Sequence, residues 1–210
     1  KDLNFFNKNI NFFIKKPAIF FDRDGVINYD YGYVHKKKDF FWKKNVIESI
    51  KYLNDANHHV FIVTNQSGIG RGLFQWDDFE KVNERMQNLL GCSAPLAAIY
   101  ANGYGPDAPY ESWRKPSPKM LLQAAMDLNL DLRSSIIVGD RLTDMQAGAS
   151  AGVAFAFHVL TGHGSSDRNS VVGWYELFES TKKVSGYKNK QWPVLKLINS
   201  LIEFPASLLK

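Results

Sequence analysis

Short apolar runs alternate with segments of helical periodicity from residue 18 to about residue 160. The apolar runs are rich in Ile, Val and Phe and lack strict alternation with polar positions, which is typical of strands buried on both faces. Strands are therefore expected at residues 18–22, 60–64, 97–101, 136–139 and 153–159. Helices are expected between them, near residues 45–56, 75–90, 117–128 and 142–151. Ser117 and Pro118 are typical of an N-cap followed by proline in the first helical turn.

This order of elements predicts an α/β fold, a three-layer doubly wound parallel sheet with right-handed crossovers. Ligands of such sheets bind beyond the carboxyl ends of the strands. The polar residues that directly follow each strand are therefore the candidates for a functional site.

The two ends of the chain follow other patterns. One stripe of an amphipathic helix is formed by Leu3, Phe6, Ile10 and Phe13. We expect this helix to dock on the body or on a partner subunit, with a membrane-surface helix as the alternative. Residues 163–173 are expected to be a loop and residues 193–203 a closing helix. The chain thus divides into an extension (1–16), a core (17–162) and a C-terminal loop and closing helix of the same domain (163–210).

Composition adds limits but no function. The 210 residues suit one domain with tails, and 45% hydrophobic and 22% charged residues are ordinary for a globular protein. The net charge is +5, from 26 Lys and Arg against 21 Asp and Glu, and the basic residues are scattered. A nucleic-acid footprint usually concentrates charge on one face, so a nucleic-acid partner is not expected.

Cysteine use and the lack of long apolar runs indicate the compartment. The single cysteine, Cys92, excludes an intrachain disulfide and an all-cysteine zinc site. No apolar run approaches the roughly 18 residues that a membrane span needs. The first 17 residues lack the apolar region and cleavage site of a signal peptide, so a cytoplasmic location is expected.

Two carboxylates follow the first expected strand. Asp22 and Asp24 are two positions apart, so in extended backbone they project to the same side, and Gly25 allows the chain to turn away. Like charges so placed repel unless a cation or a shared proton relieves them. Taken alone, the pattern also fits a turn with two solvated aspartates.

The other strand ends supply complementary groups. The second strand ends in Thr64 and a glycine-rich turn whose backbone N–H groups can bind an anion. Arg114 and Lys115 follow the third strand, and Asp140 and Asp144 follow the fourth. Together these groups predict a magnesium site beside a phosphate cradle.

These segments resemble the four motifs of the haloacid-dehalogenase-like (HAD) phosphatases, which are FFDRDGVIN, TNQSG, RKP and VGDRLTDM in this chain. Longer stretches, among them NYDYGYV, TNQSGIGRG and GDRLTDMQAGASAG, are similar to the branch of D-glycero-D-manno-heptose-1,7-bisphosphate phosphatases and histidinol-phosphatases. The resemblance covers about residues 17–162 and implies a Rossmann-like HAD fold.

The resemblance also implies a role for each motif residue. Asp22 would be the nucleophile and Asp24 the general acid and base, while Thr64 and Lys115 would stabilise the phosphoryl group. Mg²⁺ would be held by Asp22, Asp140 and the backbone carbonyl of Asp24, with Asp144 orienting the groups around it. The implied substrate contacts are Arg23, Asp30, Tyr31, Gly32, Tyr33, Asn65, Gln66, Ser67, Arg114 and Arg141.

The chain departs from this branch before the RKP motif. Members typically carry a zinc loop of three cysteines and one histidine there, but residues 102–113 contain neither Cys nor His, so no zinc is expected. Lys119 also stands where the family commonly has glycine. The short gaps after Asp24 and after Arg71 leave no room for a separate cap domain, which predicts an open, capless site shaped by residues 28–40 and 102–113.

The sequence thus predicts a Mg²⁺-dependent phosphatase that acts on a small phosphorylated sugar, most simply heptose 1,7-bisphosphate at C7, as a monomer or homodimer. A histidinol-phosphatase and a polynucleotide 3′-phosphatase are the alternative enzymes. A catalytically dead binding module is the alternative outside the enzymes.

Overall fold

The computed structural model describes residues 15–185 and 193–204. Within these residues one sheet contains six parallel strands in the order β3-β2-β1-β4-β5-β6. The strands are β1 (Ala18–Phe21), β2 (His59–Asn65), β3 (Ala98–Asn102), β4 (Ile136–Gly139), β5 (Phe155–Val159) and β6 (Val194–Ile198). The order reverses between β1 and β4, as in doubly wound folds.

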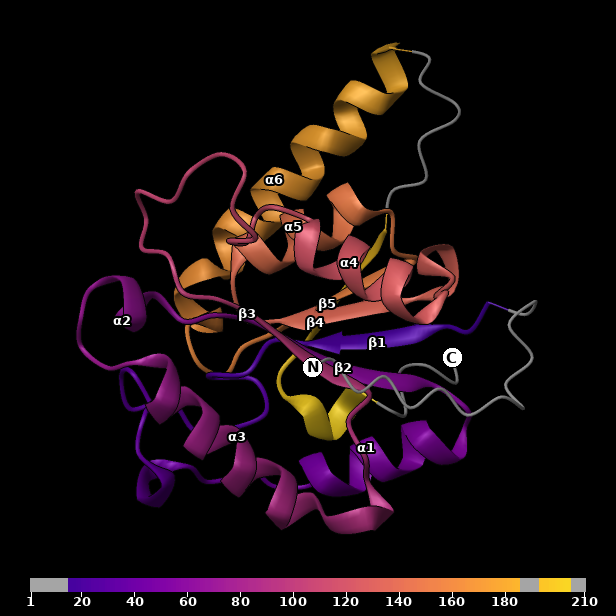
Figure 1. Ribbon diagram of the computed structural model, residues 1–210. Coiled ribbons are helices and arrows are strands. Elements are labelled where there is room, and N and C mark those ends of the chain that lie inside the picture. The colour runs from indigo at the N-terminus through magenta and orange to yellow at the C-terminus, as the bar shows by residue number, and fades with distance from the viewer. Residues whose placement is uncertain (1–14, 186–192, 205–210) are drawn as a thin grey trace.

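Helices cover both faces of this sheet (Figure 1). One face carries α4, α5 and α6, and the opposite face carries α1 and α3, while the short α2 lies beyond the ends of the strands. The helices are α1 (Val46–Asp55), α2 (Ser67–Gly70), α3 (Trp76–Leu90), α4 (Lys119–Leu128), α5 (Leu142–Ala151) and α6 (Gly164–Ser185). The three-layer α/β fold expected from the sequence is confirmed.

The strands form this sheet because their side chains serve two cores. Along β1, Ile19 and Phe21 pack into the core under α1 and α3, whereas Ala18 and Phe20 pack into the core under α4, α5 and α6. All four are fully buried. A strand buried on both faces needs apolar residues at every position, which explains the continuous apolar runs of the sequence.

The five expected strands and four expected helices are all present, with small shifts at their ends. The third of those helices, α4, begins at Lys119 with Pro118 as its N-cap, so the predicted N-cap at Ser117 is wrong by one residue. The Ser117 hydroxyl still accepts a long hydrogen bond from the Lys119 N–H, at 3.4 Å.

The loop expected at residues 163–173 is wrong, because this segment forms the first half of α6. Its Gly and Ser residues have low helix propensity, but Val171 is fully buried in the core beside α5. The carbonyl of His163 also accepts the N–H groups of Ser166 and Asp167, both at 3.0 Å. Packing and these end contacts therefore outweigh local propensity.

The closing helix expected at residues 193–203 is also wrong. Residues 194–198 form β6, which pairs in register with β5 from Phe155 opposite Val194 to Val159 opposite Ile198. A short 3₁₀ turn follows, and Phe204 packs edge-on against Phe157, with ring centroids 4.9 Å apart. An apolar run of this length fits a helix or a strand, and the open edge of β5 decides for the strand.

Two other expectations concern the ends of the chain and membranes. The amphipathic stripe from Leu3 to Phe13 lies outside the described residues. Among the helices that the structure describes, none combines the length and the apolar character that a membrane span requires.

Candidate active site

The carboxyl ends of the central strands open into a pocket of about 450 Å³. Most residues expected at the site line it, namely Asp22, Asp24, Asp30, Gly32, Tyr33, Thr64, Asn65, Gln66, Ser67, Arg114, Lys115, Arg141 and Asp144. These residues come from segments that are far apart in the sequence and meet only where the parallel strands end together.

Asp22, Asp144 and Lys115 line the floor of the pocket, and Asp140, which does not line it, is buried next to the two other carboxylates. Asp22, Asp140 and Asp144 are buried, and each offers an oxygen that lies within 4.8 Å of the other two. The Lys115 ammonium lies 2.5 Å from Asp22 Oδ1 and 2.6 Å from Asp144 Oδ1. It also donates to the Val63 carbonyl at 2.8 Å. One lysine thus faces three acids.

Burial dominates the electrostatics of this floor. It raises the pKa of Asp22 to about 7, with Lys115 opposing the change and Asp144 adding to it. It raises the pKa of Asp140 to about 8, with repulsion from Asp22 and Asp144 adding to it. Burial disfavours the charged form of Lys115, but Asp144 and Asp22 outweigh it and raise the pKa of that lysine. Without a further cation, Asp22 and Asp140 therefore keep their protons up to about neutral pH.

Asp140 has one oxygen that is ready for a further ligand. Its Oδ2 accepts the His163 backbone N–H at 2.7 Å, whereas its Oδ1 is buried without a hydrogen-bond partner among the described residues. A buried carboxylate oxygen without a partner costs free energy unless a donor or a cation meets it. Three clustered carboxylates are the oxygen ligands that Mg²⁺ prefers, so the donor set fits a hard divalent cation.

Two glycines let the chain close tightly around Asp140. A Cβ added at Gly25 would lie 2.6 Å from Asp140 Oδ2, and one added at Gly162 would lie 2.1 Å from the same atom. Both glycines have positive φ, +82° and +62°. The Thr161 hydroxyl donates to the Gly25 carbonyl at 2.6 Å and joins the two turns. Any side chain at either glycine would displace the carboxylate.

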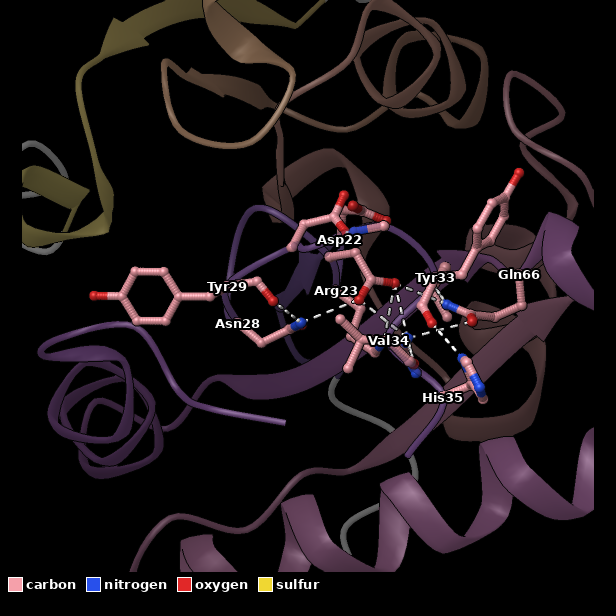
Figure 2. Close-up of polar contacts among 12 residues, drawn as sticks. Asp22, Arg23, Asn28, Tyr29, Tyr33, Val34, His35 and Gln66 are labelled. Atoms are coloured by element: carbon pink, nitrogen blue, oxygen red, sulfur yellow. Dashed lines mark hydrogen bonds and ion pairs between the residues drawn. The ribbon is translucent and has the colours of Figure 1, made fainter. Parts of the chain in front are cut away.

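Asp24 is held by donors from three residues, Arg23, Asn28 and Gln66, which are labelled in Figure 2. Arg23 donates from Nε to Asp24 Oδ2 and from NH2 to Oδ1, each at 3.0 Å. Asn28 Nδ2 donates to Oδ1 and Gln66 Nε2 to Oδ2, also at 3.0 Å. Gln66 further donates to the Thr64 hydroxyl at 2.8 Å, so it links Asp24 to the end of β2.

Arg23 was expected to contact the substrate, but it does not line the pocket. Its side chain is fully buried, and NH2 also donates to the Val34 carbonyl at 2.9 Å and to Gln66 Oε1 at 3.2 Å. The guanidinium is enclosed by Asp24, Gln66 and the Phe79 ring, whose centroid lies 5.4 Å from Arg23 Cζ. Its guanidinium holds Asp24 in place instead of facing a substrate.

The loops after β2 and β3 are locked together by Asn65. Its side chain accepts the Lys115 N–H at 3.0 Å and donates to the Lys115 carbonyl at 3.1 Å. This reciprocal pair places Lys115 beside Thr64, which is almost fully buried and lines the pocket. The hydroxyl and the ammonium can therefore meet one anion from two sides.

Three guanidiniums gather at the rim. Arg114 and Arg141 were expected there, and Arg71 was missed, although it lies in the TNQSGIGRG stretch. Burial lowers the pKa of Arg114, and the charges of Arg141 and Arg71 lower it further. Arg114 NH1 also donates to the Tyr104 carbonyl at 3.0 Å. The rim is therefore suited to a second anionic group.

Another wall of the pocket is formed by Asp30, Gly32 and Tyr33 and by His163 in the turn after β5. Asp30 Oδ2 lies 3.7 Å from His163 Nε2, so these two side chains meet across the wall. Sequence reasoning missed His163 and Thr143, although His163 follows the fifth strand and could have been found by the strand-end rule. Pro106 also lines the pocket and belongs to residues 102–113, which were expected to shape the site. Tyr31 is 70% exposed and does not line the pocket, which corrects its expected place.

Comparisons with known proteins agree with this geometry. The HAD-hydrolase-like family profile matches residues 112–173. The D-glycero-beta-D-manno-heptose-1,7-bisphosphate 7-phosphatase of Photorhabdus laumondii is 41% identical over 153 residues, which cover 70% of this chain and 81% of the relative. The chain belongs to the HAD-like hydrolases.

Two further relatives support the assignment to this family. The Mesorhizobium japonicum protein of the same name is 45% identical over 145 residues, which cover 66% of this HAD-like hydrolase and 67% of the relative. The crystal structure of D,D-heptose 1,7-bisphosphate phosphatase from B. bronchiseptica, complexed with magnesium and phosphate, has a TM-score of 0.70 at 29% identity. That match covers 92% of this chain and 98% of the other.

In this HAD-like hydrolase, polar contacts to backbone carbonyls hold residues 103–113. Lys119 Nζ donates to the Glu111 carbonyl at 2.9 Å and pairs with the Glu111 carboxylate. Near the start of this segment, Arg114 donates to the Tyr104 carbonyl, and Asn102 Oδ1 accepts the Tyr104 N–H at 3.0 Å. Lysine and arginine donors therefore shape a segment that contains no cysteine or histidine.

Proposed function

We propose that this HAD-like hydrolase is a Mg²⁺-dependent phosphatase that hydrolyses D-glycero-D-manno-heptose 1,7-bisphosphate at C7. The observation that supports it most is the buried cluster of Asp22, Asp140 and Asp144 with Lys115, of which Asp22, Asp144 and Lys115 line one pocket with Thr64. The identity of the sugar rests on the relatives, which carry the heptose bisphosphate name at 41% and 45% identity.

The metal would be held by the carboxylates of Asp22 and Asp140 and by the backbone carbonyl of Asp24. The unpartnered Oδ1 of Asp140 supports this assignment. When bound, Mg²⁺ would offset the charge of the carboxylates and of the phosphoryl oxygens. Asp144 would keep Lys115 in place, because its Oδ1 lies 2.6 Å from that ammonium.

The first half of the reaction is a transfer to Asp22. An Asp22 oxygen attacks phosphorus, and the bond from phosphorus to the C7 oxygen breaks, which leaves an aspartyl-phosphate. The leaving oxygen takes a proton from Asp24. Thr64 and the N–H of Asn65 hold the phosphoryl oxygens, while Lys115 neutralises the charge that develops on them.

The second half returns Asp22 to its starting form. Asp24, now ionised, takes a proton from a water molecule whose oxygen attacks phosphorus, and the bond from Asp22 to phosphorus breaks. The proton that Asp24 takes from this water returns it to the protonated form needed for the next turnover. A protonated oxygen accepts less readily from Arg23, Asn28 or Gln66, so at least one of those hydrogen bonds must weaken during the cycle.

Specificity would come from the rim. Arg114, Arg141 and Arg71 offer donors in the planar geometry that binds phosphate oxygens. The second phosphate of a sugar bisphosphate supplies such an anion on a small molecule. We further propose that the enzyme contains no zinc, works as a monomer or homodimer and acts in the cytoplasm; elemental analysis of the purified protein tests the first point.

A substrate panel tests the proposed function. Phosphate release would be measured with and without Mg²⁺ on heptose 1,7-bisphosphate, heptose 1-phosphate, heptose 7-phosphate, histidinol phosphate, an aryl phosphate and 3′-phosphorylated DNA. The bisphosphate is expected to have the highest kcat/KM, only with Mg²⁺, and ³¹P NMR is expected to show loss of the C7 phosphate.

Each other outcome points to another function. Strong activity on 3′-phosphorylated DNA, with none on any sugar phosphate, would make the protein a polynucleotide 3′-phosphatase. Preference for histidinol phosphate would make it a histidinol-phosphatase. The absence of any hydrolysis, including that of the aryl phosphate, would leave a binding module.

A further inference from the structure

A buried histidine contacts the strand end that carries Asp140. His158 lies in β5 and is fully buried. Its Nε2 lies 2.9 Å from the backbone carbonyl of Asp140, at the end of the neighbouring strand β4. Its Nδ1 lies 3.0 Å from Nε of Arg168, in the second turn of α6. The proposed reaction uses neither His158 nor Arg168.

These contacts decide which ring nitrogen carries the proton. Arginine can only donate hydrogen bonds, so His158 Nδ1 must accept from Arg168 and cannot carry a proton itself. The Asp140 carbonyl can only accept, so Nε2 must carry the proton and donate it. The neutral ring with its proton on Nε2 is the form that satisfies both contacts.

Arg168 is itself fixed by two strands. Its NH2 donates to the His158 carbonyl at 3.1 Å and to the Ile198 carbonyl of β6 at 2.8 Å. The preceding residue, Asp167, accepts the Leu142 N–H at 3.0 Å, at the start of α5. The beginning of α6 therefore contacts both β-strands of this edge and the helix that follows Asp140.

The carboxylate of Asp140 is tightly enclosed, so its position depends on that of the Asp140 backbone. Its Oδ2 is held by His163, its Oδ1 is buried without a described partner, and Gly25 and Gly162 leave no free space around the carboxylate. A small shift of the backbone would move Oδ1 relative to Asp22 and Asp144, because the side chain cannot rotate to compensate.

We propose that Arg168 and His158 form a positioning relay: Arg168 sets the tautomer of His158, and His158 then holds the Asp140 backbone so that its carboxylate stays in register with Asp22 and Asp144. Neither residue touches the substrate. Through this relay, the contacts of Arg168 in α6 with His158 and with β6 contribute to the affinity of the site for Mg²⁺. This last statement rests on the proposed Mg²⁺ site, whereas the tautomer does not.

Two measurements on the full chain test the relay. The first is a long-range ¹H–¹⁵N NMR spectrum of the histidine side chains without metal, which is expected to show His158 with its proton on Nε2. In Arg168→Met, which keeps the aliphatic stem and loses the guanidinium, this tautomer is expected to lose its exclusive population. The Nδ1–H tautomer in the wild-type protein would overturn the relay.

The second measurement is the Mg²⁺ dissociation constant by calorimetry. Arg168→Met is expected to weaken Mg²⁺ binding by roughly tenfold, as changes behind a metal ligand do. Arg168→Lys keeps one donor and is expected to recover part of that loss. Arg85→Met, an exposed arginine on α3 across the sheet, is the matched control and is expected to bind like the wild type.

The outcomes separate the relay from the proposed function. Equal Mg²⁺ affinity in Arg168→Met and wild type would overturn the relay. If Arg168→Met does not fold, Arg168→Lys with wild-type Mg²⁺ affinity and an altered His158 tautomer would also overturn it. If the wild-type protein binds no Mg²⁺, the proposed function fails, and the NMR spectrum still tests whether Arg168 sets the tautomer.

Discussion

Two neighbouring cations, Arg114 and Lys115, face different parts of the pocket. Lys115 is 3% exposed and contacts Asp22 and Asp144 on the floor, whereas Arg114 lies at the rim near other guanidiniums. Like charges at the rim repel until an anion joins them. Lys115 is therefore suited to the reacting phosphate, and Arg114 to a second anionic group.

Truncation of Arg114 separates these two roles. In Arg114→Ala, kcat/KM for heptose 1,7-bisphosphate should fall by roughly 10- to 150-fold, because a hydrogen bond to a charged group contributes about 1.5–3 kcal/mol. An aryl phosphate has no second phosphate, so its hydrolysis should change little. Steady-state kinetics on both substrates check this, and equal losses on the two would contradict the assigned role of Arg114.

Arg23 shows what a motif alone cannot tell about a single residue. The family resemblance implies a substrate contact for Arg23, but its side chain is fully buried and holds both oxygens of Asp24. Only its pairing with the adjacent Asp24 is local in the sequence. The other partners of Arg23, by contrast, come from Val34 and Gln66, which only the fold brings near.

At the scale of elements, the loop at residues 103–113 depends on α4. Lys119 reaches back from the start of this helix to Glu111, and Pro106 of the same loop lines the pocket. A lysine at the first position of α4 is therefore placed to fix one wall of the site. The family resemblance marks Lys119 as a departure, since glycine is common there, and the structure supplies its contact.

Loss of this contact should affect binding more than stability. In Lys119→Ala, the melting temperature should change little because exposed ion pairs stabilise weakly. KM for the bisphosphate should rise several-fold with a smaller change in kcat, since the wall near Pro106 and Arg114 loosens. Lys81→Ala, which breaks the exposed pair with Asp77 on α3, is the matched control. An unchanged KM in Lys119→Ala would mean that residues 103–113 keep their conformation without the contact between Lys119 and Glu111.

The central strands β1 and β4 were predicted correctly for one reason. Their apolar runs are buried on both faces, so local composition and tertiary position agree. The start of α6 and the strand β6 lack this agreement. Gly164 to Asp167 becomes helical through contacts of its end and the burial of Val171, and residues 194–198 become a strand because β5 has an open edge. Both causes are non-local.

For the whole molecule, the site is the meeting point of five strand ends and of turns far apart in the chain. The parallel order predicted this meeting, and with it the cluster of Asp22, Asp140 and Asp144. It could not predict which side chains of the turns point inward. Arg71 and His163 line the pocket, while Tyr31 points to solvent.

The burial of Asp22 and Asp140 should make global stability depend on pH and metal. Asp22 and Asp140 have pKa values raised from 3.8 to about 7 and about 8. Between the ordinary pKa of 3.8 and these raised values, the folded protein binds more protons than the unfolded chain. Without metal, its stability should therefore fall as pH rises from about 4 to about 8. Mg²⁺ needs ionised ligands, so it should restore stability mainly at the upper end of this range.

Melting curves with and without Mg²⁺ at about pH 5.5 and about pH 8.5 test this linkage. The increase in melting temperature on adding Mg²⁺ should be larger at the higher pH. Asp140→Asn should abolish the increase at both values, because an amide is a poorer ligand and carries no charge. An increase of the same size at both pH values in the wild type would contradict the proposed role of the buried carboxylates.

The central claim is that Asp22 is the nucleophile of a phosphatase, and the turnover of Asp22→Asn tests it most directly. The variant should fold with a melting temperature close to that of the wild type, since Lys115 keeps its contact with Asp144. Its kcat on heptose 1,7-bisphosphate with saturating Mg²⁺ should fall by roughly 10³-fold or more, as for other residues that form covalent intermediates. A kcat within about tenfold of the wild type, a loss of only about 1.4 kcal/mol, would contradict the account.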